Sequence, residues 1–426
     1  MSKSDKLLSS QSWQASVRVV EDFLKSEDKL DSLLRRHSEG LEQVVSRRIQ
    51  YLSYGVIRNL GYLQWALRST VKKAPKKRLQ AMLLLAMFEW VDADAATRPQ
   101  VVHFAVEQVK RKLSKAEGRF VNAVMRKIPE LKLDLQVPES SSGAWPAQFS
   151  HPQWMIDRWL KQFGELDTRR LLEWNQSPSR TYAWSPVSKS AIPEDWKATD
   201  WDQFYDLGSA DWKLVQRMLS DGTAYIQDPS TRIGPALLEG RGVSTILDLC
   251  AAPGGKSIQL QRAISEAGGL LVSVDLDGPR FKRLKENLLR YRREGVEQTQ
   301  VASNVLSLKP SSLPIPTFDA VYIDVPCSNT GVIQRRPDVK WRQQEQAMNE
   351  LIKLQKALLG KAAEFVKEDG YLIYSTCSLD AAENEEVVDA FIGESGSSFT
   401  KEAAISSLPW ETGHDGAGAF LLKRLK

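Results

Sequence analysis

Residues 245–257 read TILDLCAAPGGKS, a short β-rich run that passes directly into a turn containing two glycines. Further β-rich runs lie at residues 270–274, 318–323 and 371–374, a weaker one lies at 299–302, and helical stretches separate them. Strands that alternate with helices in this way predict an α/β fold with a doubly wound, mostly parallel sheet. Such sheets bind ligands at the carboxyl ends of their strands, so the residues that end each run are candidates for function.

The turn after the first run favours a cofactor without phosphate groups. Gly254 and Gly255 allow the backbone to turn sharply, but GGKS lacks the first glycine of a phosphate loop and no GxGxxG occurs here. The nearby Asp248 suits a cationic ligand better than a pyrophosphate. The second run ends at Asp275, whose carboxylate can accept two hydrogen bonds from a ribose diol. Together the two loops predict S-adenosylmethionine, which combines a ribose and an adenine with a sulfonium.

All three cysteines of the chain, Cys250, Cys327 and Cys377, lie where a predicted strand ends. Three cysteines in 426 residues do not form a disulfide framework, and the four histidines are scattered, so we expect no metal site. Each cysteine taken singly is compatible with a small apolar core residue. We expect Cys250 to pack beside the cofactor loop, whereas Cys327 and Cys377 together indicate chemistry at one rim of the sheet.

The N-terminal part differs from the rest in charge and periodicity. Residues 1–130 hold 24 Lys and Arg against 14 Asp and Glu, while the remainder holds 34 against 39. Residues 79–90 are apolar nearly all round, as in the central helix of a bundle, and the segment as a whole predicts a helical domain. Basic residues group at 72–78 and 110–119. Charge alone fits a solvated helix face as well as a surface for a polyanion.

The middle of the chain is rich in tryptophan, with eight of the thirteen between Trp145 and Trp212. We expect them mostly to fill the core of a small domain, although exposed aromatics can also stack on bases. The predicted domains are a helical domain at 1–135, a linker at 136–145, a small α+β subdomain at 146–240 and a doubly wound α/β domain at 241–426.

The start of the chain has no apolar signal-like region, and its longest strongly apolar stretch, Ala81 to Phe88, is too short to span a bilayer. These features predict a soluble, cytoplasmic protein without a membrane partner.

Four segments of the C-terminal half together resemble the RsmB/Sun branch of the NOL1/NOP2/Sun family of RNA 5-methylcytosine methyltransferases. They are LDLCAAPGGKS (247–257), VDLDGPRFKRLKENLLR (274–290), DVPCSNTGVIQRRPDVKW (324–341) and STCSLDAAENEEV (375–387). The N-terminal segments YGVIRNLGYLQWAL (54–67) and RFVNAVMRK (119–127) are similar to the NusB-like helical domain of the bacterial RsmB enzymes. The resemblance implies a Rossmann-like methyltransferase domain that uses S-adenosylmethionine, preceded by a NusB-like bundle.

The resemblance also implies roles for individual residues. Cys377 would be the nucleophile that adds to carbon 6 of a cytosine, Cys327 would assist release of the product, and Asp324 and Lys256 would complete the catalytic site. The implied substrate is small-subunit (16S) ribosomal RNA, and the target base must be unstacked to reach the pocket. The implied cofactor contacts are Cys250, Ala251, Ala252, Pro253, Gly254, Gly255, Lys256, Asp275, Asn304 and Asp324.

Several positions depart from the family pattern: Asn304 stands where an aspartate is usual, Asn329 replaces the glycine of PCSGTG, Val325 replaces the usual alanine, and AWSP near 183 lacks the usual Arg-x-Asn. An amide can still accept and donate a hydrogen bond at 304, and asparagine tolerates a positive φ at 329. Two alternatives stay open. One is the same chemistry on transfer RNA, and the other is a non-catalytic RNA-binding assembly factor, against which the retained Cys327, Cys377 and Lys256 argue.

Overall fold

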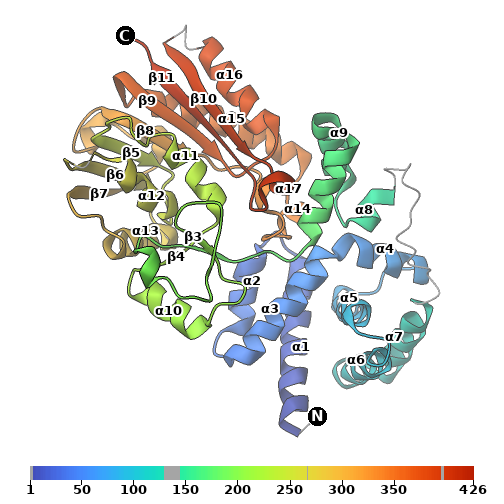
Figure 1. Cartoon of the computed structure of the whole chain (residues 1–426). Helices are drawn as coiled ribbons and strands as arrows, with labels where there is room; N and C mark the ends of the chain where they lie inside the picture. Colours follow the sequence, from blue (N-terminus) through green and yellow to red (C-terminus); the bar gives the residue numbers. More distant parts are fainter. Residues whose placement is uncertain (1–2, 129–143, 266, 395–397) are drawn as a thin grey trace. The chain divides into compact units, whose positions relative to one another are not determined.

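The computed structural model describes residues 3–128, 144–265, 267–394 and 398–426 (Figure 1). Two compact units divide the chain. The first unit comprises Met1–Ser177 together with Ile333–Arg342, and the second comprises Pro178–Val332 together with Gln343–Lys426. The chain therefore leaves the second unit for ten residues and returns to it. The predicted linker lies mostly outside the described residues, and the three predicted domain boundaries stay predictions.

The first unit is helical, as the sequence predicts for its N-terminal part. Its central helix α5 is buried along one unbroken stretch from Ala81 to Phe88, which explains why that segment is apolar all round. Helices α1, α3, α6 and α7 contribute to the same core. The helices of the unit are α1 (Lys3–Phe23), α2 (Leu30–Ser38), α3 (Gln43–Arg58), α4 (Leu60–Thr70), α5 (Lys77–Asp92), α6 (Arg98–Lys112), α7 (Lys115–Lys127), α8 (Trp145–Gln148), α9 (Gln153–Gln176) and α14 (Val339–Arg342).

The returning segment 333–342 is held in the first unit by buried polar contacts to α3. Trp341 donates its indole N–H to the carbonyl of Ile57 at 2.8 Å, and the Lys340 ammonium donates to the carbonyl of Arg58 at 2.9 Å. In return, Arg58 donates to the carbonyl of Gln334 at 2.8 Å. These contacts use carbonyls at the carboxyl end of α3, which have no partner within the helix.

The second unit is built on a seven-stranded sheet in the order β10-β11-β9-β8-β5-β6-β7. Strands β5 to β9 run parallel to one another, while β10 and β11 are antiparallel to their neighbours. The doubly wound, mostly parallel α/β fold is thereby confirmed. The strands are β5 (Thr245–Leu249), β6 (Gly269–Asp275), β7 (Val296–Ala302), β8 (Phe318–Asp324), β9 (Val366–Thr376), β10 (Phe399–Ser407) and β11 (Ala417–Arg424).

Helices cover both faces of this sheet, and the strand residues alternate between the two cores. Leu247 and Leu249 of β5 pack in the core that includes α15 and α16, whereas Ile246 packs in the core that includes α12. Strands buried on both faces are the reason that the β-rich runs are nearly continuous in apolar residues. The helices are α11 (Ile233–Ala236), α12 (Gly255–Ala263), α13 (Pro279–Arg290), α15 (Glu345–Ala363), α16 (Glu385–Glu394) and α17 (Pro409–Thr412).

A second, four-stranded antiparallel sheet precedes the large one, in the order β2-β3-β1-β4. Its strands are β1 (Tyr182–Trp184), β2 (Lys197–Ala198), β3 (Phe204–Asp206) and β4 (Tyr225–Ile226), and α10 (Trp212–Ser220) follows β3. The tryptophan-rich region is thus shared between the units. Four of its eight tryptophans are buried, while Trp212 is 43% exposed, so the expectation of a tryptophan-filled core holds only in part.

Among the helices in the described ranges, none is both long enough and apolar enough to cross a lipid bilayer.

Candidate active site

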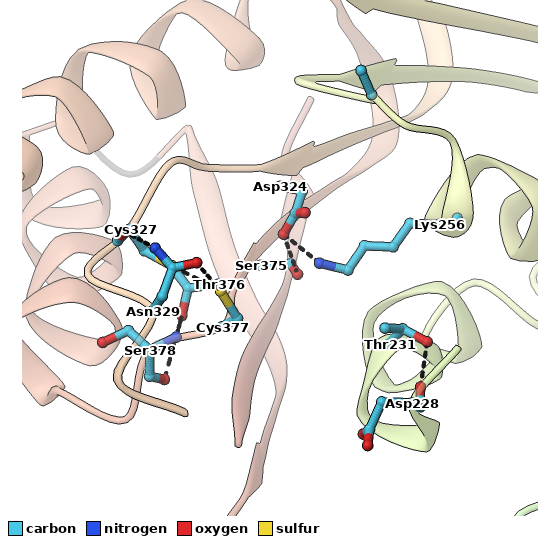
Figure 2. Close-up of polar contacts among 12 residues, drawn as sticks. Asp228, Thr231, Lys256, Asp324, Cys327, Asn329, Ser375, Thr376, Cys377 and Ser378 are labelled. Carbon is cyan, nitrogen blue, oxygen red and sulfur yellow. Dashed lines mark hydrogen bonds and ion pairs between the residues drawn. The ribbon is translucent and has the colours of Figure 1, made fainter. Parts of the chain in front are cut away.

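Cys327 and Cys377 lie side by side at the carboxyl ends of two neighbouring parallel strands. Strands β8 and β9 pair so that Asp324 stands opposite Ser375, and each cysteine follows shortly after its strand. The two sulfur atoms are 3.2 Å apart. Figure 2 shows both cysteines turned toward Asn329 at one end of the site. The structure therefore brings together the two cysteines that the sequence singled out for chemistry.

The environments of the two thiols differ. Cys327 is buried, and its hydrogen bond to Cys377, together with burial, raises the pKa of its thiol well above the usual range. Cys377 is partly exposed and donates a hydrogen bond to Oδ1 of Asn329 at 3.3 Å. Because an amide oxygen only accepts, this contact is made by the protonated thiol of Cys377. The pair thus consists of one enclosed thiol and one accessible thiol.

Asn329 shapes the turn between the two cysteines. Its backbone adopts φ 63°, a left-handed conformation that asparagine tolerates better than most residues. Its side-chain amide donates to the carbonyl of Cys327 at 2.7 Å while its oxygen faces Cys377. Asn329 therefore supports this turn through both its backbone conformation and its side-chain hydrogen bonds.

Lys256 and Asp324 form an ion pair beside the cysteines (Figure 2). Lys256 lies on α12, directly after the turn that ends β5, and Asp324 ends β8. Ser375 donates a further hydrogen bond to the same Asp324 oxygen at 3.3 Å. Burial alone lowers the pKa of the Lys256 ammonium, but attraction to Asp324 outweighs burial, and the pKa is raised. The Asp324 carboxylate is therefore held in one position at the edge of the sheet where the parallel strands end.

Asp275 holds the glycine-containing turn in place. Its Oδ2 accepts the backbone N–H of Ala252 at 2.8 Å, and its Oδ1 accepts that of Leu276 at 2.7 Å. Each oxygen keeps a second lone pair that a hydroxyl group can use. Gly254 adopts φ 101°, and a Cβ atom there would meet Leu284 at 3.0 Å. The turn thus combines a backbone that only glycine adopts easily with a half-exposed acceptor.

Other residues that the sequence predicts to contact the cofactor support the structure of the loops, as Cys250 and Asn304 show. Burial, followed by the charge of Asp275, raises the pKa of the Cys250 thiol to about 12, so this cysteine packs as an unreactive thiol. The Asn304 side chain accepts the N–H of Leu306 at 3.0 Å and caps a short 3-10 helix. Of the remaining predicted contacts, Ala251 and Ala252 are buried against α12 and α13, while Pro253 and Gly255 complete the turn.

Sequence reasoning missed several residues that hold this site. The Gln227 side chain donates to the carbonyl of Gly255 at 2.9 Å, and Glu383 contacts the residues that follow both cysteines. Neither residue ends a predicted strand, which was the signal used to select candidates. Over the described ranges, no group of three or more His, Cys, Asp and Glu side chains is arranged to hold a metal ion.

Comparison with known families gives two matches along this chain. Residues 235–411 match the family described as 16S rRNA methyltransferase RsmB/F, and residues 10–130 match the NusB family. Ribosomal RNA small subunit methyltransferase B of Cronobacter sakazakii is 25% identical, over 96% of this chain and 97% of that protein. The probable ribosomal RNA small subunit methyltransferase B of Bacillus subtilis is 27% identical, over 80% of this chain and 79% of that protein.

Solved structures share the fold. The crystal structure of PH0851 is similar with a TM-score of 0.77 at 20% identity, covering 97% of this chain and 99% of that one. The structure of NSun6 from Pyrococcus horikoshii with SFG is similar with a TM-score of 0.54 at 16% identity, covering 65% of this chain and 98% of that one. At these identities the likeness shows the fold alone.

Proposed function

We propose that this chain, which matches the RsmB/F methyltransferase family over residues 235–411 and the NusB family over residues 10–130, methylates carbon 5 of a cytosine in small-subunit (16S) ribosomal RNA. The methyl donor would be S-adenosylmethionine. The observation that carries the proposal is the pair of thiols 3.2 Å apart at the rim of the sheet. The curated relatives from Cronobacter sakazakii and Bacillus subtilis support the choice of RNA through their names.

The chemistry of cytosine explains why two thiols serve this reaction. Carbon 5 is a poor nucleophile, but a thiolate that adds to carbon 6 turns the ring into an enamine whose carbon 5 can attack a methyl group. We assign this attack to Cys377, the accessible member of the pair. The proton on carbon 5 must then pass to a base such as solvent water, and the electron pair of the C–H bond re-forms the ring double bond while the Cys377 thiolate is expelled. We assign assistance in this release to Cys327, whose thiol lies within reach of Cys377 and can donate its proton to the departing sulfur.

Asp324 and Lys256 suit the activation of the base. Asp324 is half-buried and fixed by its ion pair, so its carboxylate can hold a protonated cytosine ring by accepting a hydrogen bond from the base edge. A protonated ring accepts a thiolate at carbon 6 more readily than a neutral one. Lys256 would act through Asp324, keeping that carboxylate oriented toward the base.

The residues of the turn fit S-adenosylmethionine. Asp275 offers two carboxylate oxygens for a ribose diol, and Gly254, where a Cβ atom would meet Leu284 at 3.0 Å, lets the turn pack closely against α13. Asp324 adds a negative charge near a sulfonium. When bound, the cofactor supplies an electrophilic methyl group to carbon 5. These features support the predicted contacts from Cys250 to Lys256 and at Asp275 and Asp324, whereas the capping role of Asn304 gives its predicted contact less support.

The test uses the full chain, S-adenosylmethionine with a tritiated methyl group, 16S rRNA and bulk transfer RNA. We expect label in the 16S rRNA and, by bisulfite sequencing, a protected cytosine. Cys377→Ala should abolish labelling while calorimetry still detects cofactor binding. Full labelling by Cys377→Ala would disprove the assigned nucleophile, label in transfer RNA alone would disprove the substrate, and absence of cofactor binding by the wild-type chain would favour a non-catalytic assembly factor.

A further inference from the structure

A single buried carboxylate contacts both segments that carry the cysteines. Glu383 ends the 3-10 helix at Ala381–Glu383, and its side chain is fully buried. One of its oxygens, Oε1, accepts the backbone N–H of Ser328 at 2.9 Å. The other oxygen, Oε2, accepts the hydroxyl groups of Ser328 and of Ser378, the latter at 2.6 Å. Ser328 and Ser378 directly follow Cys327 and Cys377, so Glu383 joins the residues adjacent to both thiols.

The scaffold around Glu383 is itself fixed. Gln355 of α15 donates from one amide nitrogen to Oε1 of Glu383 and to the carbonyl of Pro326, both at 2.9 Å. Tyr374 donates its hydroxyl to the main-chain carbonyl of Glu383 at 2.6 Å. The four donors to the carboxylate, two from Ser328 and one each from Ser378 and Gln355, are neutral groups, and an ionised carboxylate can accept all of them. A buried polar network that is satisfied in this way gives its members one defined arrangement.

Thr330 makes a second set of contacts with the same two serines: its hydroxyl lies 3.4 Å from that of Ser328 and 3.1 Å from that of Ser378, and the two serine hydroxyls lie 3.2 Å apart. Thr330 donates to Asp380 at 2.8 Å and accepts the N–H of Leu379 at 3.0 Å. In addition, the N–H of Gly331 donates to the carbonyl of Cys377 at 3.0 Å. These contacts also hold the two loops together, and Glu383 adds to them a buried carboxylate that accepts hydrogen bonds from both Ser328 and Ser378.

The charge of Glu383 also acts on the thiols. After the hydrogen bond to Cys377 and burial, the negative charges of Cys377 and Glu383 contribute to raising the pKa of Cys327. The titratable groups around this point are Cys327 and Cys377 themselves, Asp380, which also accepts a hydrogen bond from Ser378, and Tyr374 of β9. Removing the charge of Glu383 would therefore make thiolate formation easier in the pair.

We propose that Glu383 is a positioning residue: it sets the separation of the two sulfur atoms and keeps the proton on Cys327, so that Cys377 is left to attack the base. The effect of Glu383 on methylation rests on the proposed function. The effect of Glu383 on the two thiols is independent of that function. Glu383 would act through Ser328 and Ser378 and touch no substrate.

Two substitutions of Glu383 distinguish the effect of its hydrogen bonds from the effect of its negative charge. In Glu383→Gln, an amide oxygen in place of Oε1 still accepts from Ser328 N–H and Gln355, and the amide nitrogen can donate to the two serine hydroxyls, which also accept. The arrangement is kept and the charge is lost. Glu383→Ala removes both. Glu386→Ala is the matched control, because Glu386 is an exposed glutamate of the following helix α16.

The first measurement is alkylation of the RNA-free protein with iodoacetamide across pH, with Cys327 and Cys377 resolved by peptide mass spectrometry. In Glu383→Gln we expect the onset of alkylation of the coupled pair to move to lower pH, because thiolate formation is no longer opposed by the carboxylate. A residue that only supports the fold would leave this profile unchanged. Glu386→Ala should match the wild-type profile.

The second measurement is methylation kinetics on 16S rRNA. We expect Glu383→Ala to lower kcat by about 100-fold with KM for RNA changed by less than about threefold, since displacement of a reacting group by about 1 Å has effects of this size. Glu383→Gln should restore kcat to within about tenfold of wild type. If Glu383→Ala does not fold, a milder change replaces it: Ser378→Ala removes one of the hydroxyl groups that donate to the Glu383 carboxylate. This variant should still lower kcat by about tenfold.

A superimposable alkylation profile for Glu383→Gln and wild type, or an unchanged kcat in folded Glu383→Ala or in Ser378→Ala, would overturn the inference. A wild-type chain that does not methylate RNA would instead contradict the proposed function, and the alkylation profiles would still decide the role of Glu383 on the thiols.

Discussion

The sulfur atoms of Cys327 and Cys377 lie 3.2 Å apart, although 50 residues separate the two cysteines along the chain. The parallel pairing of β8 with β9 brings them together, because Asp324 and Ser375 stand opposite each other where the strands end. A single carbon atom of a bound base could therefore be approached by one thiol while the other remains close enough to exchange a proton. This spacing is the basis for separating attack from release.

Cys327→Ala should trap the covalent bond between Cys377 and RNA. The substitution leaves in place the thiol to which we assign the attack but removes the sulfur 3.2 Å away to which we assign assistance in release. We expect a band of reduced mobility in a denaturing gel when the variant is incubated with RNA and S-adenosylmethionine. The double variant Cys327→Ala/Cys377→Ala is the control and should form no such band. A Cys327→Ala variant that turns over at the wild-type rate without an adduct would contradict the release role.

Asn329→Gly should make Cys377 more reactive. The Asn329 amide oxygen accepts a hydrogen bond from the Cys377 thiol at 3.3 Å and so holds this side chain in place. Glycine removes this acceptor, and it adopts φ 63° at least as easily as asparagine. We expect alkylation of Cys377 at pH 7 to be faster by about threefold to tenfold, the factor that corresponds to one hydrogen bond of about 0.5–1.5 kcal/mol. Alkylation of free glutathione added to the same sample serves as the internal reference, and an unchanged rate of Cys377 alkylation relative to it would contradict this account.

The sequence predicts the catalytic half of the fold well because its strands are buried on both faces. The runs at 245–249, 270–274 and 318–323 coincide with β5, β6 and β8, and those at 299–302 and 371–374 lie within β7 and β9. Strands β10 and β11 were not predicted. They form an antiparallel pair at the edge of the sheet, and most residues of β10 are exposed, so this strand lacks the apolar run that marks the others.

The parts of the site that the sequence could not predict depend on tertiary contacts. Glu383 is one of three glutamates within four residues, and only the fold shows that it is the buried one that contacts Ser328 and Ser378. The excursion of residues 333–342 into the first unit is likewise invisible in the sequence. It depends on Lys340 and Trp341 finding carbonyl groups at the end of α3.

The exposed basic residues of the first unit should contribute to RNA binding. All ten basic residues in the groups at 72–78 and 110–119 are exposed. We expect Lys112→Glu/Lys115→Glu to weaken binding of 16S rRNA and to reduce the slope of log K against log salt by about 1.4, at about 0.7 for each phosphate that is no longer neutralised. Lys353→Glu/Lys356→Glu is the matched control, since it reverses two exposed lysines of α15 in the second unit. Equal decreases of affinity in the two double variants would assign the effect to net charge rather than to this surface.

Lys340→Met should stabilise the protein at neutral pH. The Lys340 side chain is fully buried, and burial lowers the pKa of its ammonium well below the ordinary value. The unfolded chain therefore binds a proton at Lys340 more readily than the folded chain does. Protonation of this lysine favours the unfolded state, so the resulting loss of stability grows as pH falls below the ordinary lysine pKa of about 10.4. Methionine fills a similar volume without a charge, although it gives up the hydrogen bond to the carbonyl of Arg58 at 2.9 Å.

Urea unfolding at different pH values measures the effect of Lys340→Met. We expect the free energy of unfolding at pH 7 to rise by at least about 1 kcal/mol, the energy of less than one pKa unit, and the gain should shrink toward pH 10. Lys353→Met, at an exposed lysine, should show no such pH dependence. A loss of stability in Lys340→Met that is constant from about pH 7 to about pH 10 would instead mean that the hydrogen bond to Arg58 outweighs the penalty of burying the charge.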